Sequence, residues 1–115
     1  MAATLPKEER LCGKAAIAAL TGRGRWDHTA HLRCCCLRDT GTGLNRMMVS
    51  VPKRHFKRAV KRNLLKRRIR EAYRLQKDLL ESPGHDILVV YNCGELIEFA
   101  QIRDEVAQLL GRFAR

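Results

Sequence analysis

The feature that most constrains this chain is the stretch VKRNLLKRRIREAYR at residues 60–74, in which seven of fifteen residues are Lys or Arg and only Glu71 is acidic. At about 100° per residue, a helix through this stretch gathers apolar side chains on one side and cations on the other. The apolar stripe comprises Leu65, Ile69, Ala72, Tyr73, Gln76, Leu79 and Leu80, and the opposite row comprises Asn63, Lys66, Arg67, Arg70, Arg74 and Lys77. A helix is therefore expected from residue 60 or 61 to residue 79 or 80, with PKRHFKRA as the turn leading into it.

Positive charge is concentrated in this part of the chain. Residues 53–74 hold eleven of the 23 Lys and Arg residues and one of the 12 acids, so nearly all of the net charge of +11 lies here. A solvated helix face usually mixes signs, so that side chains at i,i+4 attract each other. Lys66, Arg70 and Arg74 instead repel one another at this spacing, and a bound polyanion would relieve that repulsion. The pattern therefore predicts a nucleic-acid-binding face.

The sequence around the basic helix favours RNA over other partners. A DNA-reading basic-zipper helix would continue into a leucine heptad repeat, whereas this one runs into SPG at residues 82–84. A membrane-surface helix would need a free apolar face, but the stripe described above is required for the core. We therefore expect RNA recognised through its backbone, and neither DNA nor a membrane.

Length and composition predict one cytoplasmic domain over residues 1–115. A chain of 115 residues buries one modest core. No window approaches the ~20 apolar residues of a membrane span, and MAATLPKEER lacks the apolar centre of a signal peptide. Five cysteines, three of them consecutive, fit a reducing compartment better than a zinc site, because neighbours on a strand point to alternate faces.

Residue patterning predicts an α+β fold in which a small sheet packs against helices. A capped helix is expected to start at TLP, residues 4–6, and to run through KEERLCGKAAIAAL. HLRCCCLR and RMMVSV alternate like two strands of a hairpin, DILVVYN is typical of a buried strand, and LIEFAQIRDEVAQLLGRF closes the chain as an amphipathic helix. The expected order is αββαβα, with room for an extra short strand near Trp26.

Residues 59–71 read AVKRNLLKRRIRE and are preceded by VPKR at residues 51–54. This run resembles the signature of the protein subunit of bacterial ribonuclease P, which reads approximately A-V-x-R-N-R-x-K-R-x-x-R-E after V-S-K-[KR]. LPKEERL, DILVVY and the closing helix also fall where that family has counterparts. The resemblance thus covers the whole chain.

The resemblance implies a left-handed βαβ crossover around the basic helix, and it implies a role. In bacterial ribonuclease P a catalytic RNA, with Mg²⁺ bound mainly by RNA, hydrolyses the phosphodiester at the 5′ end of mature tRNA within its precursor. One protein per RNA binds that ribonuclease P RNA and contacts the 5′ leader of precursor tRNA in a cleft between the first helix and the sheet. The expected RNA-binding residues are Lys53, Arg54, Lys57, Arg58, Lys61, Arg62, Asn63, Lys66, Arg67, Arg70 and Arg74.

The chain departs from the family at several positions. Leu64 stands where a second arginine is usual, so one cationic contact is missing or is supplied by a neighbour such as Arg68. Pro52 replaces the usual serine. Asn63 has two interpretations, as an acceptor for a metal-bound water or as the helix cap.

The leader cleft of the family is lined by aromatic side chains, because bases stack on π-faces. This chain has no aromatic residue in its expected first helix. The candidates for such a cleft are Leu11, which stands where a Phe is usual, Trp26, and Arg33 and Cys35 on the alternate face of HLRCCCLR. The cysteine also fits simple core packing.

Two other hypotheses remain open at this point. A ribosomal or other structural RNA-binding protein would follow the same charge logic. A protein nuclease is disfavoured, because no acids are paired for two-metal hydrolysis and His31 and His55 show no nucleophile or acidic partner. We expect the RNA to carry the chemistry, with no catalytic residue and no metal site in the protein.

Overall fold

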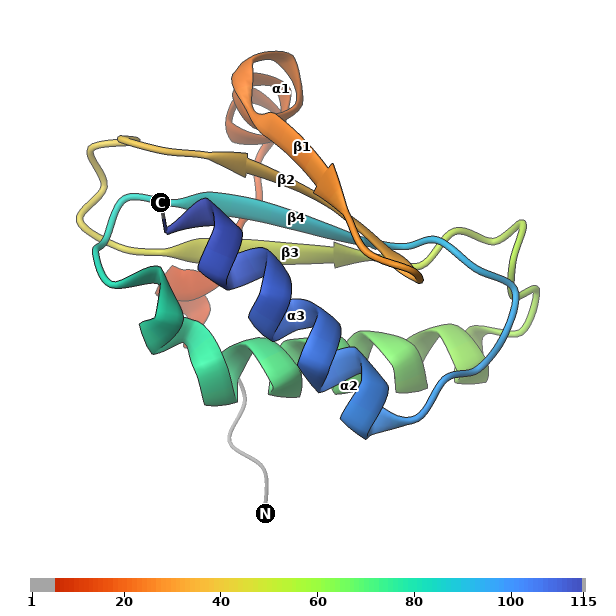
Figure 1. Cartoon of the computed structure of the whole chain (residues 1–115). Helices are drawn as coiled ribbons and strands as arrows, with labels where there is room; N and C mark the ends of the chain where they lie inside the picture. The colour runs from red at the N-terminus through yellow and green to blue at the C-terminus, as the bar shows by residue number, and fades with distance from the viewer. Residues whose placement is uncertain (1–5, 115) are drawn as a thin grey trace.

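The computed structural model describes residues 6–114 and confirms the α+β class (Figure 1). Its helices are α1 (Lys14–Arg23), α2 (Ala59–Gln76) and α3 (Phe99–Phe113), and its strands are β1 (Arg25–His28), β2 (Leu32–Leu37), β3 (Arg46–Ser50) and β4 (Asp86–Tyr91). Two short 3₁₀ helices, η1 (Lys7–Glu9) and η2 (Lys77–Leu80), precede α1 and follow α2. The extra strand considered near Trp26 is present as β1.

The four strands form one mixed sheet in the order β1-β2-β4-β3. β1 and β2 are antiparallel, as are β2 and β4, whereas β3 and β4 are parallel and are connected through α2. The predicted hairpin between β2 and β3 is therefore wrong, because β4 lies between them and the hairpin joins β1 to β2. DILVVY takes this central position because it is apolar on both faces, and both faces are covered there. The left-handed sense of the β3-α2-β4 crossover stays a prediction.

Helices α2 and α3 cover one face of the sheet, and α1 lies on the other (Figure 1). The predicted stripes are confirmed by burial of Leu65, Ile69, Ala72 and Tyr73 on α2 and of Ile102, Val106, Leu109, Leu110 and Phe113 on α3. Leu79 is 43% exposed, because the chain tightens into η2 after Gln76. Since the stripe of α2 faces the core, the cationic side of this helix is turned to solvent.

The first helical segment differs from the prediction. Residues 4 and 5 of the expected cap lie outside the described residues, η1 ends at Glu9, and Gly13 at φ 98° separates it from α1. Between them the N–H of Leu11 donates to the carbonyl oxygen of Met47 at 2.9 Å, and Arg10 forms a bridge with the same residue. This short segment therefore covers the free edge of β3, and Leu11 lies beside the sheet rather than on a helix.

Candidate nucleic-acid interface

Eight cations between residues 53 and 70 have side chains that pair with no other described residue. They lie in the loop between β3 and α2 and on the part of α2 turned away from its buried stripe. Seven are exposed and Lys66 is half-buried. The eight are Lys53, Arg54, Lys57, Arg58, Lys61, Lys66, Arg67 and Arg70. Unpaired like charges in one region create a positive potential that attracts a polyanion.

A shallow surface depression of about 450 Å³ lies within this cationic surface, lined by Val60, Asn63, Arg67 and Arg70. The two guanidinium groups match phosphate oxygens, and the exposed amide of Asn63 matches a hydroxyl or base edge. The interpretation of Asn63 as the helix cap is wrong. Helix α2 begins at Ala59 with Arg58 at its cap position, so Asn63 lies a full turn inside it.

Two arginines of the basic segment are directed at backbone carbonyl groups of the chain itself. Arg62 Nη1 donates to the carbonyl oxygens of Phe56 at 2.7 Å and Lys57 at 2.8 Å. Arg68 Nη1 donates to the carbonyl oxygen of Ile97 at 2.9 Å, which ties α2 to the loop between β4 and α3. Arg68 is therefore engaged inside the fold and does not replace the arginine that the family has at the position of Leu64.

The C-terminal end of the predicted cationic row is neutralised by acids. Arg74 forms two hydrogen bonds with Glu71, from Nε at 2.9 Å and from Nη2 at 2.7 Å, and they lower the pKa of the Glu71 carboxyl below its usual range. Lys77 Nζ lies 2.8 Å from Glu9 Oε1 and joins the end of the helical segment to η1. The row of free cations on α2 therefore ends at Arg70 and is shorter than predicted.

The four residues predicted for a leader cleft fall into two pairs. Leu11 and Cys35 are 5% and 0% exposed in the small core beneath α1, so neither offers surface to a base. Trp26 is 40% exposed, and the guanidinium carbon of Arg33 lies 4.7 Å from the centre of its ring. Trp26 and Cys35 are register partners and so point to the same face, the one that carries α1. The chain thus presents two separate candidate surfaces, on opposite sides of the sheet.

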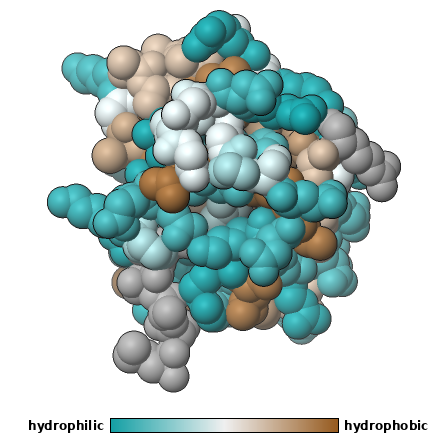
Figure 2. Space-filling view, turned by 90° about the vertical axis from the view of Figure 1, so that its left-hand side faces the viewer, coloured by the Kyte–Doolittle hydropathy of each residue, from teal (hydrophilic) through white to brown (hydrophobic). Residues whose placement is uncertain are grey.

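The side of the molecule at the left of Figure 1 is mostly hydrophilic, with apolar residues scattered over it (Figure 2). Single exposed apolar residues are normal and indicate no partner. Within residues 6–114, no helix is both long and apolar enough to cross a membrane.

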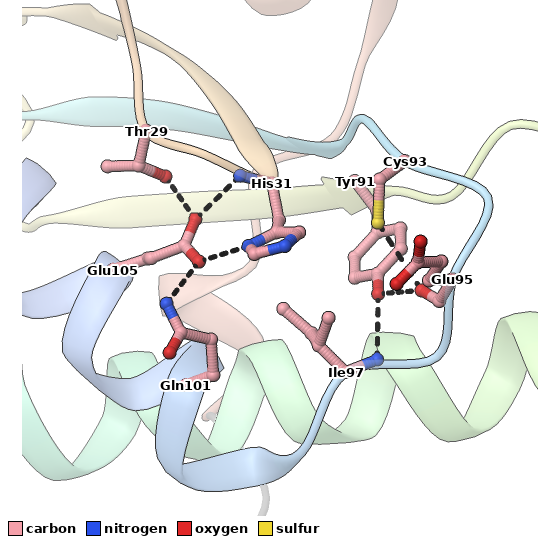
Figure 3. A network of polar contacts seen from close by, with 8 residues as sticks. All are labelled: Thr29, His31, Tyr91, Cys93, Glu95, Ile97, Gln101 and Glu105. Atoms are coloured by element: carbon pink, nitrogen blue, oxygen red, sulfur yellow. Dashed lines mark hydrogen bonds and ion pairs between the residues drawn. The ribbon is translucent and has the colours of Figure 1, made fainter.

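A buried polar network joins α3 to the turn between β1 and β2 (Figure 3). The carboxylate of Glu105, a residue that is 1% exposed, accepts hydrogen bonds from the hydroxyl of Thr29, from the backbone N–H of His31 at 2.9 Å, from His31 Nδ1 at 2.5 Å and from Gln101 Nε2 at 2.8 Å. The expectation that His31 lacks an acidic partner is wrong. Its partner lies 74 residues away and is brought close by the packing of α3.

The order of donors in this network does not suit catalysis. In a catalytic triad the histidine takes the proton of the nucleophile, and the carboxylate orients the histidine. Here the hydroxyl of Thr29 donates directly to Glu105, so His31 does not activate it. Burial raises the pKa of Glu105, but the hydrogen bonds from Thr29, Gln101 and His31 outweigh it and lower the pKa to about 2. The network therefore holds two parts of the fold together. Among residues 6–114 no group of three or more His, Cys, Asp or Glu is placed to hold a metal ion.

A family model described as Ribonuclease P matches residues 5–114. The chain belongs to the ribonuclease P protein family. The ribonuclease P protein component of Desulfovibrio desulfuricans is 32% identical over 113 residues, which cover 96% of this chain and 87% of that protein. The counterpart in Porphyromonas gingivalis is 48% identical over 60 residues, which span 52% of this chain and only 41% of that protein.

Solved structures of ribonuclease P proteins share this fold. The protein from Thermotoga maritima superposes with a TM-score of 0.78 at 25% identity, covering 90% of this chain and 96% of that one. The protein from Staphylococcus aureus superposes with a TM-score of 0.77 at 22% identity, covering 89% of this chain and 92% of that one. Membership in the ribonuclease P protein family sets aside the hypothesis of a ribosomal protein.

Proposed function

We propose that this chain is the protein subunit of a ribonuclease P and that its free cations bind the catalytic RNA of that enzyme. The supporting observation is that eight cations between residues 53 and 70 pair with no other residue of the described part of the chain, while Arg62, Arg68 and Arg74 of the same segment have partners within the fold. Phosphates that contact these groups release condensed counterions, which drives association. Within the expected RNA-binding set, Arg62 and Arg74 contribute less direct contact, because both guanidinium groups already have partners.

The opposite face of the sheet is proposed to hold the single-stranded 5′ leader of precursor tRNA. Trp26 and Arg33 provide a partly exposed ring beside a planar cation, and a base stacks on either. Leu11 and Cys35 support this surface from below through core packing rather than by contact. Two RNA segments are then bound on two faces at once, with the sheet between them.

Hydrolysis is assigned to the RNA subunit and the Mg²⁺ ions that it holds. The protein, with one copy per RNA and in the cytoplasm, neutralises repulsion between phosphates and positions the precursor. The direct hydrogen bond from Thr29 to Glu105 fits this division of labour, because this hydroxyl donates to the carboxylate and is not activated by His31.

Reconstitution tests the proposal. The protein is added to a bacterial ribonuclease P RNA at low Mg²⁺, and cleavage of a precursor tRNA at its mature 5′ end is followed. Cleavage should rise with added protein and saturate at one protein per RNA. The double variant Arg67→Ala/Arg70→Ala should lower the stimulation, whereas Asp104→Asn on the exposed side of α3 should not. Absence of stimulation contradicts the proposal, and cleavage without the RNA indicates a protein nuclease.

The leader surface has its own test. Trp26→Ala should weaken binding of a precursor with a leader by about 1–3 kcal/mol per stacked base, with no effect on mature tRNA, and Trp26→Phe should retain most of the affinity. Equal losses for the precursor and the mature tRNA contradict the assignment of this face.

A further inference from the structure

Arg62 differs from Arg67 and Arg70 of the same helix in what its side chain contacts. Both hydrogens of Nη1 are directed at carbonyl oxygens of the preceding loop, at 2.7 Å from Phe56 and 2.8 Å from Lys57. The side chain is half-buried, whereas Arg67 and Arg70, further along the helix, are exposed and unpaired. Arg62 therefore points back along the chain instead of out from it.

The loop that receives these hydrogen bonds is short of other backbone contacts. Between β3 and α2 one backbone hydrogen bond closes a turn, from the N–H of His55 to the carbonyl oxygen of Pro52 at 3.2 Å. The ring of Phe56 anchors the loop in the core, 5.7 Å from the ring of Tyr91. The carbonyl groups of residues 56 and 57 stand just before the helix, and the Arg62 guanidinium satisfies both through charge-assisted hydrogen bonds.

The same loop carries four unpaired cations, Lys53, Arg54, Lys57 and Arg58. Their mutual repulsion favours an open and disordered loop, and a mobile loop loses conformational entropy when RNA orders it. A contact that fixes the backbone at residues 56 and 57 removes part of this cost before binding.

We propose that Arg62 is a positioning residue, which holds the loop of residues 53–58 in the conformation that presents its cations to the RNA backbone. This role rests on the proposed function, which makes the loop an RNA contact. It assigns to Arg62 an effect through Lys57 and Arg58 rather than a phosphate contact of its own.

A double-mutant cycle tests this role. Ribonuclease P RNA affinity is measured for the wild type, Arg62→Ala, the loop variant Lys57→Ala/Arg58→Ala, and their combination. Arg62→Ala should weaken binding about tenfold in the wild type and less than about twofold in the loop variant, because the cations it positions are then absent. Arg70→Ala is the matched control, since Arg70 lies eight residues further along the helix, about 12 Å from Arg62. Arg70→Ala should weaken RNA binding by the same factor in the wild type and in the loop variant. Equal losses for Arg62→Ala in both backgrounds overturn the positioning role and indicate a direct contact.

A second measurement uses the free protein, so that its outcome does not depend on RNA. Hydrogen exchange at the amide of His55, the loop N–H that donates to the carbonyl oxygen of Pro52, should quicken in Arg62→Ala and remain as in the wild type in Arg70→Ala. Arg62→Lys keeps the charge and one donor group, and it should restore part of the exchange protection and part of the affinity. Unchanged exchange in Arg62→Ala overturns the inference. If exchange quickens but the loop variant binds RNA like the wild type, Arg62 fixes the loop without a role in RNA binding, and this overturns the inference while the cations of α2 remain as the proposed RNA surface.

Discussion

His31 Nδ1 donates a hydrogen bond to Glu105 Oε2 at 2.5 Å, linking the turn after β1 to the middle of α3. Three further hydrogen bonds reach the same carboxylate, from Thr29, from the His31 backbone and from Gln101. A buried charge is tolerated only when its lone pairs are satisfied, and here four donors satisfy them. This carboxylate holds the β1-β2 hairpin, and with it Trp26, against the rest of the fold.

Replacing this carboxylate should destabilise the protein without altering its surface. In Glu105→Gln an amide nitrogen faces groups that themselves donate, so at least one hydrogen bond is lost and a buried donor is left unpaired. We expect the free energy of unfolding in urea to fall by about 2–3 kcal/mol. Asp104→Asn, on the adjacent exposed position of the same helix, should change it by less than about 0.5 kcal/mol. Similar losses for the two variants contradict the importance of the network.

The carboxyl group of Glu105 should also make the stability of the protein depend on pH. The pKa of Glu105 is lowered from an ordinary 4.5 to about 2 in the folded protein, so the unfolded chain binds a proton at higher pH than the folded one does. The ionised Glu105 carboxylate therefore contributes to the free energy of unfolding in full above about pH 5. This contribution amounts to about 3 kcal/mol at most, and it is lost as the pH falls from about 4.5 towards 2. Unfolding in urea at several pH values measures this, and the stability gap between wild type and Glu105→Gln should narrow over that window. A gap that is constant down to pH 2 contradicts the lowered pKa.

Local periodicity was sufficient to predict the basic helix. The burial of Leu65, Ile69 and Tyr73 follows from the 3.6-residue repeat, and the outward direction of Arg67 and Arg70 follows from the same geometry. The α+β class follows in the same way from the alternation of strand and helix patterns. These features depend on neighbours within a few residues, which a sequence displays directly.

Features that depend on distant partners were missed. The alternation of β2 and β3 is compatible with a hairpin, and only the competition for the central position decides that β4 separates them. Glu105 looks like a surface residue of α3 until its donors from residues 29 and 31 are known. Arg62 and Arg68 look equivalent to Arg67 by charge, although backbone carbonyl groups of distant or preceding loops engage them.

Two glycines at the end of α1 provide a further contrast. A Cβ on Gly24 would lie 2.5 Å from Cys35 Sγ and closer still to the carbonyl oxygen of Leu20, whereas a Cβ on Gly22 meets nothing within 4 Å. Gly24→Ala should therefore lower the free energy of unfolding by about 1–3 kcal/mol through overpacking. Gly22→Ala lies within the helix and should raise it by about 0.5–1 kcal/mol. Thermal and urea unfolding of both variants provide the measurement, and equal effects contradict the close packing of α1 on β2.

The free cations of α2 should determine how RNA affinity depends on salt. Each phosphate contact contributes roughly 0.7–0.9 to the slope of log affinity against log salt concentration, so Arg67→Ala/Arg70→Ala should flatten the slope by about 1.4–1.8. Arg74→Ala is the matched control, because Arg74 lies on the same helix but is paired with Glu71. Arg74→Ala should change the slope by less than about half of the change caused by removing one free arginine. Filter binding of ribonuclease P RNA at several salt concentrations gives both slopes.

If Arg74→Ala flattens the slope as much as Arg67→Ala does alone, the ion pair with Glu71 opens on binding and the RNA surface extends to the end of α2. If the double variant Arg67→Ala/Arg70→Ala leaves the slope unchanged, the RNA contacts lie in the loop of residues 53–58 and the helix face is assigned wrongly.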